Sequence, residues 1–412
     1  MALTGEFFYR LGDFFGGAFG SNSRNAEKWF FKQRLQYQLN QGNVYINTAV
    51  PYKIYNTIPQ FKIPVDKLAA MFSNGIWKYR KIGGDELDMP NDLKALLNNP
   101  NLLQDQNSFM KLYYKQLKVY GNQYLYKNQP SKLAIPKTIQ CISPTYLRPV
   151  LTGKLFDQID LSGVISRYDY EDGASVKPFA TETILWSKID DLDNPLIGIS
   201  PLKGLEFPIS NTELAYKYLN CISGEKGGIG ILSTAPQKDS AGPIPLTPQE
   251  KKDIESTFRQ ENGIEENQKK VHITTTPTTW TPTSYPTGQL LLLEQIDANF
   301  LTILAQLGVN NNVFVSSTYD NLRNGLVMTH NDTVVPDADS AAQSWTKFLN
   351  VKEGYELFLD YSHLPYLQPD KVSEASTFGA VSSGLSGLVS SGIINPSMAQ
   401  AMLTNEFGVK TA

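Results

Sequence analysis

The chain contains 412 residues, of which 41% are apolar and 19% are charged, and its formal net charge at pH 7 is −3. This length and balance indicate a folded protein of two or three domains and exclude a disordered chain. A protein that holds nucleic acid tightly through its phosphates usually carries a basic excess, and this sequence has none.

The first fifteen residues are rich in aromatic side chains but differ from a signal peptide. They lack a basic start, and Glu6, Arg10 and Asp13 interrupt the apolar run. The apolar side chains fit one face of a helix, which we expect to dock on its own subunit or on a neighbour. A helix on a membrane surface is the less favoured alternative, because almost no Lys or Arg is present to face anionic lipid. Along the chain, no apolar stretch approaches the ~20 residues that a membrane span needs.

The next part of the chain predicts helices followed by strands. Residues 60–80 begin as a helix and continue into a strand, a second helix covers 92–98, and a third covers 106–119. From residue 121 to 188, short β-prone runs alternate with Pro, Gly and Asn. Helices followed by a run of strands are typical of an α+β domain. The core face of the third helix is predicted to consist of Phe109, Leu112, Tyr113, Leu117 and Tyr120.

Two long helices are predicted in the middle of the chain, over 201–222 and 290–307. Pro208 predicts a break or kink in the first of them. Between them we expect a loop over 235–246, a capped helix over 247–260 and a threonine-rich strand over 270–280. The second long helix carries an apolar stripe and is followed by Gly308, which is placed to cap it. The stripe consists of Leu293, Ile296, Phe300, Ile303, Leu304 and Leu307.

Helices also dominate the last part of the sequence. Residues 310–319 are expected to form an exposed polar loop, and a helix follows over 320–351 with a bend near Pro336. A further helix is predicted over 374–391 and another over 395–406. The two cysteines, Cys141 and Cys221, are far apart in sequence, so we expect buried thiols in a reducing compartment rather than a disulfide framework.

No motif in the sequence assembles catalytic chemistry. The segment 224–230 is rich in glycine but lacks the Gly-Lys-Ser/Thr ending of a phosphate loop, so a helix stop is favoured. Each of the histidines, His272, His330 and His363, lacks a partner at metal-ligand spacing. Asp332 lies two residues after His330, which leaves a hydrolase as one alternative, but no nucleophile motif accompanies the pair. We expect neither a metal nor a cofactor.

Charged side chains are concentrated between residues 238 and 270. A solvated surface is the ordinary interpretation of such a cluster. Because the segment separates two long helices, a projecting surface that faces a partner is the second interpretation. The charged residues are Lys238, Asp239, Lys251, Lys252, Glu265, Glu266, Lys269 and Lys270. A second, acidic group without EF-hand spacing indicates a solvated turn, and it consists of Asp190, Asp191 and Asp193.

The segment that follows the second long helix has almost no charge. An ordinary loop can have this composition, but the same lack of charge suits a surface along which a polyphosphate must slide. Its candidate residues are Asn310, Asn311, Asn312, Val313, Phe314, Ser316 and Ser317.

Several short motifs follow one another in a distinctive order. Residues 96–101 read Leu-Leu-Asn-Asn-Pro-Asn, residues 121–126 read Gly-Asn-Gln-Tyr-Leu-Tyr, and residues 184–188 read Ile-Leu-Trp-Ser-Lys. Residues 195–202 read Pro-Leu-Ile-Gly-Ile-Ser-Pro-Leu, and the helix over 290–307 ends in Gly-Val-Asn. Over about residues 50–408 this order resembles the siphovirus-type portal proteins of tailed bacteriophages. The chain departs from the family pattern at Trp186, where His is common, and at Asn310, where the family has Pro.

The resemblance implies an α+β portal-type fold with an α/β wing, a helical stem, a small α/β clip and a helical C-terminal crown. It places the wing at 1–200, the stem helices at 201–223 and 289–307, and the clip at 224–288. It also implies a tunnel loop over 308–320 that lines a DNA channel, a wing or tunnel helix over 321–352 and a crown over 353–412.

The resemblance also implies a mechanical function without catalysis. Portal proteins form a homo-oligomeric ring, of twelve subunits in the finished capsid, at one vertex of the virion. The ring nucleates capsid assembly, docks the terminase motor through its large subunit, conducts double-stranded DNA without sequence specificity, and seats the head–tail connector or adaptor. The expected partners include the major capsid protein, with assembly in the host cytoplasm and no membrane. Another capsid or connector protein is the alternative, and a hydrolase is the less favoured one.

Overall fold

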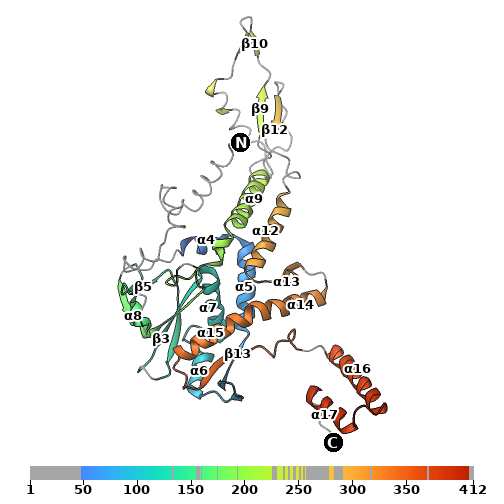
Figure 1. The fold of residues 1–412 in the computed structure, drawn as a ribbon. Helices are drawn as coiled ribbons and strands as arrows, with labels where there is room; N and C mark the ends of the chain where they lie inside the picture. The colour runs from blue at the N-terminus through green and yellow to red at the C-terminus, as the bar shows by residue number, and fades with distance from the viewer. Residues whose placement is uncertain are drawn as a thin grey trace.

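The computed structural model describes residues 48–131, 134–154, 158, 160–173, 175–192, 194–224, 230–234, 237–239, 242–244, 247–249, 252–253, 256, 278–282, 291–315, 318–368 and 371–407. The aromatic helix expected at the N-terminus lies outside these residues. Figure 1 shows a broad body of helices and sheets, from which the helices α9 and α12 rise side by side towards a group of short strands. The helices α16 and α17 lie on the other side of the body.

The main core is built by helices and one sheet that come from both ends of the chain. Helices α4 (Ala49–Thr57), α5 (Pro59–Ser73), α6 (Asn91–Asn98), α7 (Gln106–Tyr120) and α15 (Val335–Phe348) contribute to it. Trp345 of α15 is buried at its centre, stacked on Trp77 with ring centroids 5.0 Å apart and edge-on to Phe109 and Tyr113. These aromatic contacts fasten α15 to elements more than two hundred residues earlier in the sequence.

The sequence marks both ends of α7. The carboxylate of Asp105 accepts a hydrogen bond from the Ser108 N–H (2.9 Å), which caps the first turn. Gly121 follows the helix with φ of 68°, a conformation that L side chains rarely adopt. The predicted helix over 106–119 is therefore confirmed. Its buried face differs in part, because Met110 and Tyr114 are buried while Leu112 and Leu117 are half-buried.

A three-stranded antiparallel sheet joins the two ends of the body, in the order β13–β1–β2. It contains β1 (Ile76–Lys81), β2 (Glu86–Leu87) and β13 (Tyr355–Asp360), with Ile76 opposite Asp360. The resemblance places residues from 353 onward in a helical crown, and this is wrong for β13, which is a strand of the body. The error arises because the partner strand β1 is distant in sequence, so local patterns do not reveal the pairing.

Two further antiparallel sheets occupy the region where the sequence predicts strands. One has the order β4–β3–β8 and contains β3 (Asn122–Asn128), β4 (Thr138–Ile142) and β8 (Ile184–Lys188). The other has the order β5–β6–β7 and contains β5 (Leu147–Leu151), β6 (Ile165–Glu171) and β7 (Val176–Phe179). Short helices α8 (Leu161–Val164) and η1 (Thr181–Thr183) lie between these strands in sequence. A second, smaller core around Tyr124 and Tyr168 joins the two sheets.

The two long helices pack against each other and run in opposite directions (Figure 1). A 3-10 turn, η2 (Pro201–Gly204), precedes α9 (Glu206–Gly224), and α12 (Leu292–Gln306) returns to the body. Pro208 lies in the first turn of α9, where a missing N–H is tolerated, so the predicted break falls before the helix, at Leu205. The predicted stripe on α12 is wrong at Leu293, whose side chain is 66% exposed.

Short strands lie beyond the ends of α9 and α12. β9 (Gly230–Thr234) pairs with β12 (Thr278–Pro282), and β10 (Gln237–Asp239) pairs with β11 (Gly242–Ile244). The loop predicted over 235–246 is therefore wrong for β10 and β11, which form a hairpin. The predicted threonine-rich strand is present as β12, and the part of it predicted over 270–277 lies outside the described residues. The helix expected over 247–260 falls mostly outside the described residues.

The short helix α13 (Asn312–Val315) follows α12. One long helical stretch then consists of α14 (Tyr319–Thr329), the π-helical turn His330–Val334, labelled η3, and α15. The bend predicted near Pro336 corresponds to this turn, in which the Val335 N–H donates to the His330 carbonyl. Pro336 has no N–H and its ring would clash with the carbonyl four residues earlier in a regular α-helix, so a wider turn precedes it. Beyond the body, α16 (Lys371–Ser390) and α17 (Pro396–Phe407) are the last described elements.

Candidate functional site

Three of the sequence motifs meet at the buried side chain of Asn122. Its Oδ1 accepts hydrogen bonds from the Gly198 N–H (2.9 Å) and from the Trp186 Nε1–H (3.0 Å). Its Nδ2 donates to the Gly198 carbonyl (2.8 Å) and to the Tyr120 carbonyl (3.1 Å). The segments 121–126, 184–188 and 195–202 are therefore structural motifs that join β3, β8 and the approach to η2. Trp186 keeps an N–H donor at this position, which is the property it shares with histidine.

The end of α12 is fixed by a Schellman motif. The Val309 N–H donates to the Leu304 carbonyl (2.8 Å), and the Gly308 N–H donates to the Ala305 carbonyl (3.1 Å). Gly308 has φ of 71°, and a Cβ at this position would overlap the Thr333 hydroxyl, so glycine is required here. Leu304 and Val309 are both buried, which supplies the apolar contact of this motif. The predicted cap at Gly308 is confirmed.

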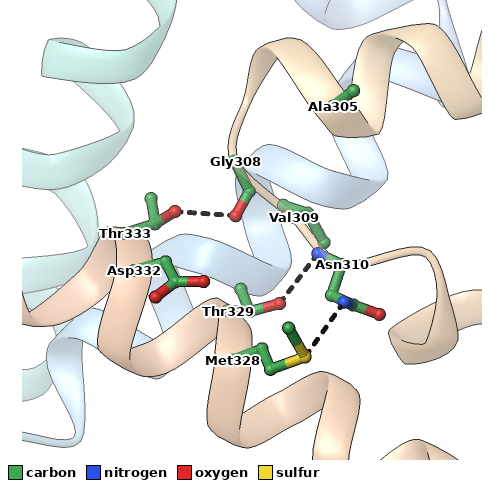
Figure 2. Close-up of a pocket in the computed structure, with 8 residues that line it drawn as sticks. All are labelled: Ala305, Gly308, Val309, Asn310, Met328, Thr329, Asp332 and Thr333. Carbon is green, nitrogen blue, oxygen red and sulfur yellow. Dashed lines mark hydrogen bonds between the residues drawn. The ribbon is translucent and has the colours of Figure 1, made fainter.

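The candidate channel segment, residues 310–317, is attached to the π-helical turn and to the end of α14. The Asn310 N–H donates to the Thr329 hydroxyl (2.9 Å), and the Thr333 hydroxyl donates to the Gly308 carbonyl (2.7 Å). Asn310 Nδ2 also lies 3.5 Å from the sulfur of Met328. Figure 2 shows these three interactions around one hollow. The long helix therefore determines where the segment leaves the body.

The candidate residues differ in their surroundings. Asn311, Asn312 and Val315 are exposed, and the described part of the segment carries no formal charge, as the sequence predicts. Val313 is buried, and Phe314 packs edge-on to Phe300 of α12, with ring centroids 5.6 Å apart. The prediction of a simple exposed loop is therefore wrong for residues 312–315, which form the short helix α13. Ser316 and Ser317 lie outside the described residues.

A hollow of about 300 Å³ lies between the end of α12 and the π-helical turn (Figure 2). Ala305, Gly308 and Val309 form one side, and Asn310, Met328 and Thr329 form another. Asp332 and Thr333 complete the lining. No local motif in the sequence marks this site, because it depends on the π-helical turn, and only the bend near Pro336 indicated that turn.

His330 and Asp332 do not form a catalytic pair in the described structure. His330 is buried between Tyr361 and Tyr366, with the Tyr366 hydroxyl 3.3 Å from its Nδ1, whereas Asp332 is exposed. Burial lowers the pKa of His330 to about 4, so the imidazole is neutral at pH 7. Its Nε2 has no hydrogen-bond partner among the residues that the structure describes. This environment is that of a core histidine, and it gives no support to the hydrolase alternative.

The charged residues expected on the projecting segment are only partly placed. Lys238 and Asp239 belong to β10, at the far end of the molecule from the body (Figure 1). Lys252 is exposed. Lys251, Glu265, Glu266, Lys269 and Lys270 lie outside the described residues. The acidic group is also placed in part, since Asp190 pairs with Lys188 (2.5 Å) and Asp191 lies 3.8 Å from Lys203.

Two further properties concern the described residues alone. They contain no group of three or more His, Cys, Asp or Glu side chains arranged to hold a metal ion. None of their helices combines the length and the apolar character that a bilayer span requires.

The fold is similar to those of several solved structures. The neck of an empty gene transfer agent particle, computed with C6 symmetry, has a TM-score of 0.61 and 16% identity, covering 89% of this chain and 94% of that one. The neck of a native particle, computed with C12 symmetry, has a TM-score of 0.59 and 15% identity, with 90% and 98% covered. An HK97 family phage portal protein from Corynebacterium diphtheriae has a TM-score of 0.52 and 11% identity, with 79% and 100% covered. The predicted α+β portal-type fold is confirmed.

The family follows from the sequence. The family model described as phage portal protein matches residues 65–395. Because this range covers most of the 412 residues, the chain belongs to the phage portal protein family, and its function is that of a portal protein. No curated protein matches the sequence.

Proposed function

We propose that twelve copies of this chain close into a ring whose central channel carries DNA at one vertex of a phage capsid. The observation that carries this proposal is the apolar surface of the two stem helices, α9 and α12. Each helix uses one face to pack on its partner helix and on the body, and each has a second face on which apolar side chains remain exposed. A ring supplies the missing contacts from neighbouring copies.

On α9 the exposed face is defined by Phe207 and Leu214, which are 52% and 49% exposed. They are seven residues apart, about two turns, and therefore lie on the same side of the helix. The buried residues Ile209, Thr212 and Ala215 follow a different side, while the small side chain of Ser210 is buried between Phe207 and Leu214. Two large apolar side chains on one side of a solvent-facing helix favour association.

On α12 the exposed face is defined by Ala298, Leu301 and Ala305, spaced by three and four residues. The buried residues Ile296, Ile303 and Leu307 lie on the opposite side. Two of the three side chains on this face are alanine methyl groups, whereas the face of α9 carries the large side chains of Phe207 and Leu214. Such unlike faces favour a heterologous, head-to-tail contact, which forms a ring when the rotation between copies closes.

The two gene transfer agent necks support the proposed symmetry. One was computed with C12 symmetry and the other with C6 symmetry, and both are compatible with a ring of twelve.

We assign the wing to residues up to 200 and to 321–360, which include β13. The stem consists of 201–223 and 289–307, the clip of 224–288, the tunnel loop of 308–320 and the crown of the helices from 371 onward.

The tunnel loop is the part of the chain that we expect to contact the DNA. Asn310, Asn311, Asn312 and Val315 present amides and apolar groups without formal charge. A charged lining would bind the phosphates and slow the passage of DNA, because each phosphate contact adds electrostatic affinity. An uncharged lining at the narrowest point allows DNA to pass in both directions without sequence specificity.

The clip and the wing account for the proposed contacts with other proteins. The clip, with Lys238 and Asp239 at its far end, would face the terminase motor during packaging and the head–tail connector afterwards. The wing would contact the major capsid protein. We place the assembled ring in the virion and its assembly in the host cytoplasm. The role is mechanical, without a catalytic step or a cofactor.

Negative-stain electron microscopy combined with native mass spectrometry tests the ring. We expect particles with a central hole wide enough for duplex DNA and a mass close to twelve times 46.0 kDa. Leu214→Arg should abolish these particles. Leu102→Arg is the control, because Leu102 is also an exposed leucine but lies in a turn of the body, and it should leave the particles unchanged. A compact oligomer without a channel, or a chain that stays monomeric at high concentration, would contradict the proposal.

A further inference from the structure

We infer that the phenyl ring of Phe207 inserts into the hollow beside Gly308 of the neighbouring subunit. This inference rests on the proposed ring and specifies which residues meet across its interface. It begins from two unexplained features of the described residues, an exposed phenylalanine on α9 and an open hollow at the end of α12.

The two features lie at the same height on the stem. α9 begins at Glu206 and α12 ends at Gln306, and the two helices run in opposite directions, so both ends are at the foot of the stem (Figure 1). Gly204, just before α9, lies beside the side chain of Gln306, to which an added Cβ would be 3.4 Å distant. Phe207 and Ala305 therefore occupy the same level, which a rotation about the ring axis preserves.

Within one subunit the two features point in different directions. Phe207 lies on the side of α9 that is turned away from buried Ile209 and Thr212, and Ala305 lies on the side of α12 that is turned away from buried Ile296 and Ile303. Phe207 is not among the residues that line the hollow of its own chain. In a head-to-tail ring, the α9 face of one copy meets the α12 face of the next, and Phe207 then reaches the neighbour's hollow.

The hollow suits an aromatic ring in size and in chemistry. Its volume of about 300 Å³ is sufficient for a phenyl group, since apolar cavities of about 150 Å³ bind benzene. Ala305, Val309 and the thioether of Met328 supply apolar walls, and a methionine sulfur contacts aromatic rings favourably. Asp332 also lines the hollow and is exposed, so its carboxylate can approach the positive edge of the ring.

This contact connects ring closure to the channel segment. Met328 is 51% exposed, and its sulfur lies 3.5 Å from Asn310 Nδ2. A neighbouring Phe207 would cover Met328 and restrict the side chain against which Asn310 rests. Each subunit would then help to order the channel segment of the next one.

Cross-linking tests the contact directly. Phe207→Cys combined with Met328→Cys, in a protein whose Cys141 and Cys221 are replaced by alanine, should be joined by a short bifunctional maleimide. Because the contact is heterologous, denaturing electrophoresis should show a ladder that extends beyond dimers. Phe207→Cys combined with Leu293→Cys is the matched control, since Leu293 lies on the same helix as Ala305 but about 18 Å further up the stem. The control should give no ladder.

The possible results separate the two proposals. Rings in the microscope without a Phe207–Met328 ladder, or with dimers alone, overturn this inference and leave the ring intact. A ladder from the control pair that is as strong as that of the test pair also overturns it. A sample that forms no rings before cysteine is introduced overturns the proposed ring, and with it this contact. As a second measurement, Ala305→Trp, which fills the hollow, should reduce ring formation at least tenfold, whereas Ala305→Ser should not.

Discussion

Asn122 and Gly198 exchange two hydrogen bonds, one through each end of the Asn122 side-chain amide. The Gly198 N–H donates to Oδ1, and Nδ2 donates to the Gly198 carbonyl. The amide thus replaces a peptide group and holds two separate segments together as a neighbouring strand would. Because Asn122 is fully buried, each of these groups lacks access to water if its partner is removed.

Asn122→Ala should therefore destabilise the protein strongly. The substitution leaves the Gly198 N–H, the Gly198 carbonyl and the Trp186 indole N–H without their partner, and we expect a loss of at least about 3 kcal/mol of unfolding free energy. Urea denaturation of the protein measures it. Asn128→Ala, at the exposed end of the same strand, is the control and should change stability by less than about 0.5 kcal/mol. Equal effects of the two substitutions would contradict this account of Asn122.

Gly198→Ala should be at least as damaging, for a steric reason. A Cβ at Gly198 would overlap the Gly121 carbonyl oxygen and lie 2.6 Å from Asn122 Oδ1, and neither the backbone nor the locked amide can move easily. Gly379→Ala in α16 is the comparison, since nothing lies within 4 Å of its added methyl group. It should raise stability by about 0.5–1 kcal/mol through helix propensity. Thermal unfolding of both variants measures these effects. A lower melting temperature for Gly198→Ala alone would show that the lack of space for a Cβ requires glycine at this position.

The stability of the body should depend on pH through His330. Burial lowers the pKa of His330 to about 4, below its ordinary value of 6.5, so the unfolded chain binds a proton more readily than the folded one. Unfolding free energy should therefore fall as the pH decreases from about 6.5 to about 4, by up to about 3 kcal/mol. His330→Gln should remove this contribution, which would be visible as a weaker pH dependence in urea denaturation between pH 7 and pH 5. An unchanged pH dependence would show that His330 does not contribute.

Thr329→Val should loosen the channel segment without altering the stem. The substitution keeps the shape of the side chain but removes the hydroxyl that accepts the Asn310 N–H, and Thr329 is buried. Amide hydrogen exchange of residues 309–315 should accelerate about tenfold, since loss of about 1.4 kcal/mol of local stability has that effect. Thr57→Val, an exposed threonine of α4, is the control. Unchanged exchange in the segment would show that another contact fixes its position.

A positive charge in the channel segment should convert a weak DNA contact into a strong one. Asn311 is exposed and uncharged, and a ring of Asn311→Lys subunits would place an added charge in every copy. DNA affinity measured as a function of salt should then rise at low salt and fall steeply as salt increases. Lys94→Asn, on the exposed side of α6, is a control that should leave affinity unchanged. If Asn311→Lys has no effect on DNA binding, the segment does not face the channel.

The sequence predicted those elements whose signals are local. The ends of α7 follow from a capping aspartate and a following glycine, and the end of α12 follows from Gly308, so both were placed to within one or two residues. The strand β13 was misplaced because its partner is distant in sequence, and the hairpin β10–β11 was missed because three-residue strands carry almost no periodicity. The candidate channel segment is uncharged by composition, but its anchoring by Thr329 and Thr333 depends on a helical turn of unusual width, of which the residues indicate only the bend near Pro336.

The π-helical turn has a geometric consequence for the candidate channel segment. It contains one more residue than the regular helix would need, so removing one residue between His330 and Val334 could restore an α-helical course. That change would rotate α14 by about 100° about its own axis relative to α15, and it would carry the Thr329 hydroxyl away from Asn310. A single inserted or deleted codon at this point could therefore change the direction of the channel segment while leaving the packing of Trp345 and the body untouched.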